Sequence, residues 1–246
     1  MTGSERSGEA GHRGRRAEVA RPERSGGRVT EFFDLLLPDE QAALEAAGHR
    51  KQWKRGAVIY REGSRSDSVV VVRSGRAKVS SDTASGTEVV LAVRGPGALL
   101  GELSAIDGGP RSATVTALEP VTALSVPSPD FERYLLGHAR VSFLLMRELA
   151  RRLRDADRKR IEFGAYDTTG RVAARLVELA ERFGEQTGDG LRINLPLSQD
   201  ELAGWTGASR EAVTKALRTL REEGLIQTGR LYVIVRDLSE LRDRAQ

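Results

Sequence analysis

The 246-residue chain contains no cysteine and only three histidines. The missing cysteine excludes disulfides, cysteine-ligated iron–sulfur clusters, a thiolate haem ligand and zinc ribbons. His12, His49 and His138 are scattered, and no two of them have the i, i+3 or i, i+4 spacing that places two ligands on one helix face. We therefore expect neither a protein metal site nor a histidine-based catalytic triad.

Long hydrophobic runs are also missing. No stretch approaches the roughly 18–20 apolar residues that a membrane span requires. The first residues, MTGSERSGEAGHRGRR, lack the apolar segment of a secretory signal. The sequence thus predicts a cytoplasmic protein without a membrane partner. Its formal net charge of +4 gives only a weak preference for a polyanionic partner.

Composition changes sharply along the chain. Residues 1–28 consist mainly of glycine, serine, arginine and glutamate, so they predict a disordered extension that buries little apolar surface. Short runs rich in β-branched residues follow, separated by glycines. These runs are VIY (58–60), VVVVR (69–73), AKVSS (77–81), EVVLAV (88–93), ATVTAL (113–118) and VTALSV (121–126). They predict an antiparallel β-roll or barrel.

A helical period begins after Ser128 and continues for about 35 residues. Leu145, Leu149, Leu153 and Ala156 recur within it at spacings of four, four and three, and most other positions there are charged. A narrow apolar seam of this kind is typical of a helix that pairs with a second copy. The alternative is a helix that packs on its own barrel. We favour pairing, because the seam beyond Leu149 is too narrow to cover a core.

The remaining residues, 167–246, predict a small helical unit. Its expected elements are an amphipathic helix over 170–183, a loop over 184–190, a strand over 191–195, two short helices, and a hairpin over 225–235 that turns at Thr228 and Gly229. Before these, residues 30–46 predict two short helices in succession. The whole pattern predicts an α+β protein.

The two short helices carry the strongest functional pattern. Ser198 with Glu201 three residues later forms a capping box, and Ser209 caps the second helix after a glycine turn. That second helix ends at Gly224 and has an apolar face for packing. Its other face carries Arg210, Glu211, Thr214, Lys215 and Arg218.

Two helices joined by a tight turn, followed by a hairpin, predict a winged helix-turn-helix that binds double-stranded DNA. Arginine or lysine donates to guanine, and glutamate accepts from cytosine N4. Glu211 favours base reading, because pure phosphate binding would not place a carboxylate against a polyanion. The DNA-contacting residues that we predict are Ser198, Ser209, Arg210, Glu211, Thr214, Lys215 and Arg218. The alternative is an ordinary solvated helix face.

Over roughly residues 29–236 the chain resembles the cAMP receptor protein and FNR (Crp/Fnr) family of bacterial transcription regulators. The resemblance is carried by GAVIYREG (56–63), by Gly75, by GELSAIDGGPRSA (101–113) and by SREAVTK (209–215). It implies a cyclic-nucleotide-binding, jelly-roll-like β-roll over 29–130, a long dimerisation helix over 131–166 and a winged helix-turn-helix over 167–246. The GELSAIDGGPRSA segment (101–113), called here the cassette, looks like the family's phosphate-binding element.

The resemblance also assigns roles to four cassette residues. Arg111 supplies a guanidinium for forked contact with a phosphate, and Ser112 adds a hydroxyl and a backbone N–H. Glu102 accepts from the ribose 2′-hydroxyl, and Gly101 lets the backbone come close to the ligand. The alternative is a surface loop in which Glu102 and Arg111 only pair with each other.

One departure from the family concerns the long helix. Members that respond to cAMP carry a Thr-Ser pair there that contacts adenine within and across the dimer, and these positions are Ala156 and Asp157 in this chain. Ala156 donates nothing, while Asp157 could accept from adenine or guanine. We expect cAMP as allosteric effector; the alternative is an altered or absent effector, with cGMP, another anion or constitutive DNA binding. Lys215 replaces the more usual arginine, so one guanine contact would be single-point.

Other motifs are weak. RGPGALLGE (94–102) faintly imitates a dinucleotide fingerprint, but Pro96 and its strand context argue against it. Glu102 and Asp107 could be imagined as an active-site pair, yet no further polar constellation joins them, so we expect no enzyme activity and no metal.

The sequence therefore predicts a homodimer that places two recognition helices one helical turn apart on palindromic half-sites. RNA polymerase is a further candidate partner. Two alternatives of other classes are a constitutive or architectural DNA-binding protein with a vestigial sensor, and a nucleotide-binding module without sequence-specific DNA recognition.

Overall fold

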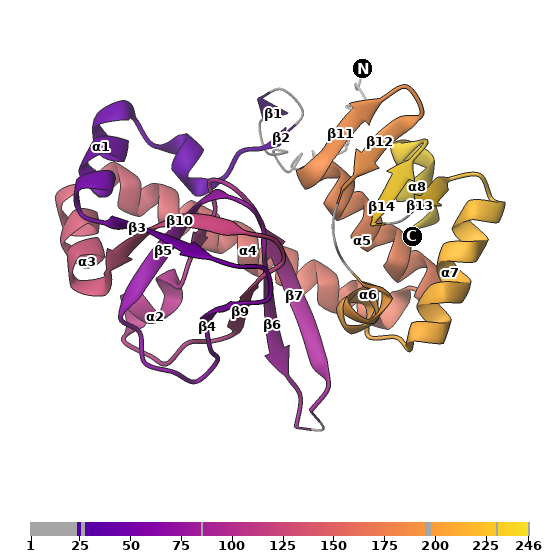
Figure 1. The fold of residues 1–246 in the computed structure, drawn as a ribbon, viewed down its shortest axis with the longest axis horizontal. Helices are drawn as coiled ribbons and strands as arrows, with labels where there is room; N and C mark the ends of the chain where they lie inside the picture. Colours follow the sequence, from indigo (N-terminus) through magenta and orange to yellow (C-terminus); the bar gives the residue numbers. More distant parts are fainter. Residues whose placement is uncertain (1–23, 26–27, 85, 195–197, 230, 246) are drawn as a thin grey trace, which may run out of the picture.

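The computed structural model describes residues 24–25, 28–84, 86–194, 198–229 and 231–245 (Figure 1). Most of the predicted N-terminal extension, 1–28, lies outside these ranges. Its described part contains a two-stranded antiparallel ribbon, β1 (Arg24–Ser25) with β2 (Arg28–Val29). The 3-10 helix η1 (Phe32–Leu35) and helix α1 (Pro38–Ala46) follow, as the sequence predicts.

Two four-stranded antiparallel sheets form the predicted β-roll. One sheet has the order β3 (His49–Trp53), β10 (Val121–Pro127), β5 (Ser68–Ser74) and β8 (Leu99–Leu100). The other has the order β4 (Val58–Tyr60), β9 (Thr114–Ala117), β6 (Ala77–Asp82) and β7 (Glu88–Arg94). All the predicted strands are present, and β3, β8 and helix α2 (Glu102–Asp107) are additional.

The valine run in β5 explains how the roll is filled. Successive side chains of a strand point to opposite faces. Val70 and Val72 belong to the cluster between the two sheets, which also contains Tyr60. Val69 and Val71 belong to a second cluster with the helices that cover the outer face of the sheet. A run of valines without polar alternation is therefore a strand that is buried on both faces.

The predicted 35-residue helix is two helices, α3 (Ser128–Gly137) and α4 (Ala139–Ala165). The prediction of one continuous helix is wrong at His138, where φ is −130° and ψ is 77°. The break is stabilised at Leu135 O, which accepts from His138 N at 3.2 Å and from the Ser142 hydroxyl at 2.7 Å.

The predicted apolar seam of α4 is divided between two faces. Leu145 and Leu149 pack against the cluster that covers the β-roll, so the alternative of packing on its own barrel is correct for these two residues. Leu153 is 65% exposed and Ala156 is also exposed. The exposed apolar row of α4 consists of Phe143, Met146, Ala150 and Leu153, whose spacings of three, four and three follow a heptad.

The C-terminal unit begins with α5 (Thr168–Phe183) and has a four-stranded sheet of order β11, β12, β14 and β13. The remaining elements are β11 (Gly184–Thr187), β12 (Gly190–Ile193), α6 (Gln199–Thr206), α7 (Arg210–Glu222), β13 (Ile226–Gly229), β14 (Tyr232–Val235) and α8 (Leu238–Arg244). Figure 1 shows this unit beside the β-roll, with α6 next to β7.

Two predictions in this unit need correction. Residues 184–190 are not all loop, because Gly184–Thr187 pairs with Gly190–Ile193 as an edge strand. The C-terminal hairpin does not turn at Thr228 and Gly229, because both residues belong to β13 and pair with Val233 and Tyr232 of β14. In both places the glycines indicate that a turn is near, but they do not show where the flanking strands end.

The β-roll and the C-terminal unit share one apolar cluster. Val90 and Val93 of β7 pack with Trp205 of α6 and with residues of α5. Lys78 of β6 donates to Glu201 at the start of α6 at 3.1 Å, and Arg182 of α5 donates to Glu31 at 2.8 Å. The β-roll and the C-terminal unit are thus in direct contact.

No helix in the described ranges combines the length and apolar character that a bilayer crossing demands. In the same ranges, acidic and histidine side chains nowhere gather in a group of three or more that could hold a metal ion.

Candidate functional site

Two of the predicted cassette residues, Gly101 and Arg111, are in direct contact. Gly101 has φ +83°, and a Cβ at that position would lie 2.5 Å from Arg111 Nη1 and 2.9 Å from Tyr60. Only glycine therefore fits between the cassette backbone and these two side chains. The guanidinium of Arg111 is 3.7 Å from the centre of the Tyr60 ring, in cation–π geometry.

Arg111 is buried, with 3% of its surface exposed. Nη1 donates to Gly101 O at 3.0 Å, and Nη2 donates to Ser68 O at 2.5 Å and to Asp67 Oδ1 at 3.2 Å. The Nε atom of Arg111 is buried without a hydrogen-bond partner. Buried donors are almost always paired, so this N–H marks a place for an acceptor.

Asp67 and Ser68 accept from Nη2 of Arg111, whereas Gly101 accepts from Nη1. The Ser68 hydroxyl donates to Asp67 Oδ1 at 2.9 Å. This hydrogen bond, together with the positive charge of Arg111, holds the pKa of Asp67 below its usual value. Asp67 is therefore a carboxylate at neutral pH, and it neutralises part of the charge on Arg111.

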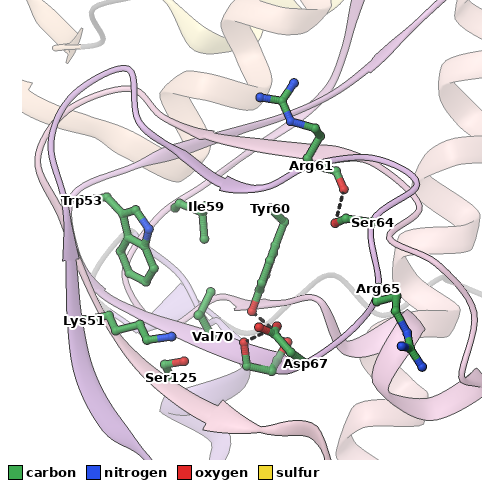
Figure 2. Close-up of a pocket in the computed structure, with 11 residues that line it drawn as sticks. Lys51, Trp53, Ile59, Tyr60, Arg61, Ser64, Arg65, Asp67, Val70 and Ser125 are labelled. Atoms are coloured by element: carbon green, nitrogen blue, oxygen red, sulfur yellow. Dashed lines mark hydrogen bonds between the residues drawn. The ribbon is translucent and has the colours of Figure 1, made fainter.

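A cavity of about 370 Å³ adjoins this arrangement. Its lining comes from β3, β4, β5, β10 and the loop between β4 and β5. Figure 2 shows Tyr60, Trp53 and Asp67 among the residues around it. Tyr60, Asp67 and Ser68 line the cavity and also contact Arg111. The Ser125 hydroxyl, buried and without a partner, lines it as well.

Glu102 does not pair with Arg111, contrary to the alternative of a simple surface pair. Glu102 is 3% exposed and accepts from Arg152 Nη1 of α4 at 2.7 Å. Arg152 also donates to Glu148 at 2.8 Å and to Leu99 O at 3.0 Å. Burial opposes ionisation of Glu148, but Arg152 and Arg151 outweigh it and hold its pKa below the usual value. Arg152 was not predicted, although it lies four residues before Ala156.

Of the other three predicted effector residues, Ser112 directly follows Arg111 in the chain, whereas Ala156 and Asp157 lie on α4. Ser112 is exposed at the start of the segment that leads to β9. Ala156 and Asp157 are exposed on α4, where Asp157 lies 4.0 Å from Arg160. Asp107, the other acidic residue of the cassette, accepts from Gly109 N at 2.8 Å and so shapes the loop before Arg111.

The second predicted site, on α6 and α7, has the expected local structure. Ser198 accepts from Glu201 N and the reciprocal bond from Ser198 N to Glu201 completes the capping box. Ser209 accepts from Ala212 N at 3.2 Å and starts α7. Gly207 adopts φ +59° in the turn between the helices. Val213, Ala216 and Leu220 are buried, so the opposite face of α7 points outward.

The outward face of α7 forms a groove of about 450 Å³ with the start of α6. The residues that line it are Gln199, Arg210, Glu211, Thr214, Lys215 and Arg218. Gln199 was not predicted, although its position directly after the cap Ser198 is a usable signal. Hydrogen bonds from its own backbone N–H and from Ser209 lower the pKa of Glu211, so it is an acceptor at neutral pH.

Contacts within the groove order some of these side chains and leave others available. The Thr214 hydroxyl lies 2.9 Å from Gln199 Oε1 of α6 and 2.8 Å from Arg210 O of its own helix, and the first contact joins the two helices. Arg218 pairs with Glu222 one turn later at 2.8 Å. Arg210 lies 3.7 Å from Asp200, and both side chains are largely exposed. Exposed pairs of this kind are weak and exchange easily for a nucleic-acid partner.

Comparison with known families matches both halves of the chain. Residues 50–138 match the cyclic nucleotide-binding domain, and residues 170–244 match the Crp-like helix-turn-helix domain. The first match contains the cassette and the Arg111 site, and the second contains α6, α7 and their groove.

Two relatives match this chain over nearly their full length. The chain is 35% identical to the "CRP-like cAMP-activated global transcriptional regulator" of Mycobacterium tuberculosis (strain H37Rv), over 87% of this chain and 96% of that protein. It is 32% identical to the "Cyclic AMP receptor protein" of Thermus thermophilus, again over 87% and 96%.

Among solved structures, FixK2 from Bradyrhizobium japonicum has the same fold, with a TM-score of 0.72 at 21% identity over 81% of this chain and 98% of that one. The printed name of the Mycobacterium tuberculosis relative is that of a transcriptional regulator. With both domains and nearly the full length matched, the chain belongs to the Crp/Fnr family of transcriptional regulators.

Proposed function

We propose that this regulator is a homodimer whose binding to DNA is controlled by a cyclic nucleotide, cAMP in the first place, held at Arg111. The observation that carries the proposal is the buried Arg111 guanidinium, which has an unpaired Nε–H and contacts Tyr60, Asp67 and Ser68 in the wall of a cavity. A cyclic phosphate diester carries one negative charge and accepts forked hydrogen bonds from a guanidinium. Mycobacterial and Thermus relatives whose names refer to cAMP support the choice of nucleotide.

Four cassette residues would hold the nucleotide. Arg111 binds the phosphate, and Gly101 allows the backbone to approach because no Cβ stands there. Ser112 lies next to Arg111 in the chain and is exposed, so its hydroxyl is available to the same phosphate. Glu102 offers a carboxylate to the ribose hydroxyl, in competition with Arg152.

Arg152 would couple the bound nucleotide to the long helix α4, because it pairs with Glu102 of the cassette. A nucleotide that hydrogen-bonds to Glu102 would compete with its ion pair to Arg152 of α4. α4 also contacts α5 through Lys159 and Glu178 at 3.2 Å. Ligand binding would thus favour one arrangement of sensor and DNA-binding units over another.

The dimer would form along the exposed row of α4, Phe143, Met146, Ala150 and Leu153. Asp157 continues this row one turn later. In a dimer it would face the partner's sensor, where it could accept from a purine amino group. Because Ala156 and Asp157 replace the donor pair of cAMP-responsive relatives, the second candidate is a regulator with a different effector, cGMP or another anion, or with constitutive DNA binding.

DNA would contact the groove of α6 and α7. Arg210, Lys215 and Arg218 supply donors for guanine or phosphate, and Glu211 supplies an acceptor for cytosine N4. A dimer places two such helices on palindromic half-sites about one helical turn apart. This function locates the protein in the cytoplasm, with the DNA.

The test has two steps. A DNA site is first selected from random duplexes in the presence of cAMP, and its affinity is then measured by fluorescence anisotropy without nucleotide, with cAMP and with cGMP. We expect a palindromic site and tighter binding with cAMP. Equal affinity in all three conditions would support constitutive DNA binding, and selection without any consensus would contradict sequence-specific regulation.

A further inference from the structure

Asp67 accepts a hydrogen bond from Arg111 Nη2, a donor that a nucleotide phosphate would also need. A guanidinium has five N–H donors. Three of those of Arg111 are used, one from Nη1 to Gly101 O and two from Nη2 to Ser68 O and Asp67 Oδ1. The two that remain are Nε–H and one N–H of Nη1. These two donors are not adjacent on the guanidinium.

A forked contact with a phosphate requires two adjacent N–H groups. One edge of the guanidinium is formed by Nε and Nη2, and the other by Nη1 and Nη2. Both edges therefore need a hydrogen of Nη2, and both hydrogens of Nη2 of Arg111 are already donated. A phosphate can be gripped by two donors only after one of the Nη2 partners leaves.

The two partners of Nη2 differ in how easily they leave. Ser68 O belongs to the first residue of β5 and also accepts from the Tyr60 hydroxyl at 2.9 Å. Asp67 lies in the loop before β5, its side chain is 80% exposed, and its 3.2 Å contact is the longest of the three. Rotation of an exposed side chain is far easier than displacement of a strand, so Asp67 is the partner that exchanges.

We propose that Asp67 is an internal competitor of the effector phosphate, which sets the nucleotide concentration at which the sensor responds. The proposal rests on the proposed function of Arg111 as the phosphate ligand. The Asp67 carboxylate accepts the hydrogen bond from Arg111 Nη2, and its negative charge repels an incoming phosphate. Arg111 does not depend on Asp67 for its position, because Tyr60 stacks on it and two backbone carbonyls accept from it.

The opposite role would be a positioning residue that orients Arg111 for the ligand. The two roles predict opposite effects of removing the charge. Asp67→Asn preserves the shape of the side chain, and its amide oxygen can still accept from the Ser68 hydroxyl. A competitor then weakens and nucleotide affinity rises, whereas a positioning residue is lost and affinity falls.

The experiment is calorimetric titration of cAMP into the full-length wild type, Asp67→Asn, Asp67→Glu and Glu45→Gln. The last variant is the control, because it removes an exposed carboxylate that pairs with Arg73 at 2.8 Å, away from Arg111. We expect Asp67→Asn to bind cAMP about threefold to tenfold more tightly, the effect of removing one competing charged hydrogen bond. Asp67→Glu keeps the charge and should not reach that affinity, and Glu45→Gln should match the wild type.

Thermal unfolding midpoints will show that all four proteins fold. Equal or weaker cAMP binding by Asp67→Asn, with normal binding by the wild type and control, would overturn the competitor role and leave the proposed function intact. Tighter binding by both Asp67→Asn and Glu45→Gln would overturn it too, since a general charge effect would explain the gain. Absence of nucleotide binding in every protein would instead overturn the proposed function, and the inference with it.

Discussion

Arg152 Nη1 donates to Glu102 Oε1 at 2.7 Å, and this ion pair joins the long helix α4 to the cassette. The two residues are 50 positions apart in the chain. Glu102 is almost fully buried, so it depends on Arg152 for compensation of its charge. A ligand that hydrogen-bonds to the Glu102 carboxylate therefore competes with the ion pair that joins the β-roll to α4.

Replacement of Arg152 by glutamine tests this dependence. Glu102 and Glu148 would then be buried with one fewer charged partner, and the free energy of unfolding should fall by roughly 3 kcal/mol. Urea unfolding followed by circular dichroism measures it. Arg218→Gln is the control, because its pair with Glu222 is exposed on both sides and should cost less than about 1 kcal/mol. Equal losses in the two variants would contradict a special role for the Arg152 pair.

Gly101→Ala tests the close approach of the cassette backbone to Arg111. The added Cβ would meet Arg111 Nη1 at 2.5 Å, so we expect cAMP affinity to fall more than about tenfold. Gly56→Ala is a matched control, since Gly56 has φ +79° but nothing within 4 Å of its Cβ position. Both variants carry the backbone strain of about 1–3 kcal/mol, and only Gly101→Ala carries the clash. If calorimetry finds the same cAMP affinity in both variants, the close approach of Gly101 to Arg111 is not needed for binding.

Tyr60 gives a pH-dependent signature of the same site. Burial raises its pKa to about 12, from the ordinary tyrosine value of 10.0. Because the folded-state pKa is the higher one, the stabilisation is fully present below pH 10 and is lost as the pH rises to 12.

The unfolding free energy of the wild type should therefore fall by about 1 kcal/mol more than that of Tyr60→Phe between pH 9 and pH 11. Denaturant titrations at the two pH values give the comparison. If the difference between the two proteins stays constant with pH, the Tyr60 phenol is not protected by burial.

Arg210→Ala tests base reading in the groove. On a selected DNA site we expect a loss of about 1–3 kcal/mol, with little loss on random DNA. Arg242→Ala removes the same charge from α8, where Arg242 pairs with Glu181 at 2.6 Å outside the groove, and should affect both DNAs alike and weakly. Anisotropy titrations that show equal losses on selected and random DNA for Arg210→Ala would make it a phosphate contact.

Local signals predicted most of the fold. β-branched runs between glycines located the strands of the β-roll, and the serines at 198 and 209 located the starts of α6 and α7. Each of these signals depends on residues within a few positions of one another. β3 was missed because HRKQW has no apolar alternation: four of its five residues are exposed, and it forms by pairing with β10 at the edge of the sheet.

The candidate site was predictable only in part. Gly101 and Arg111 were found from the cassette sequence. The side chains that contact Arg111 from more than 40 residues earlier were not: Tyr60 of β4, Asp67 of the following loop and Ser68 of β5. The two faces of α4 could not be separated, since leucines that pack on the β-roll and leucines that face outward have the same helical period. Pairings at long range are set by the topology and leave no local pattern.

The most direct test of the account is calorimetric titration of cAMP into the wild-type protein and into Arg111→Ala. We predict saturable binding by the wild type and loss of measurable binding by the variant, with both proteins folded by circular dichroism and of the same mass in solution. Equal cAMP affinity in the two proteins would contradict the claim that Arg111 holds the effector.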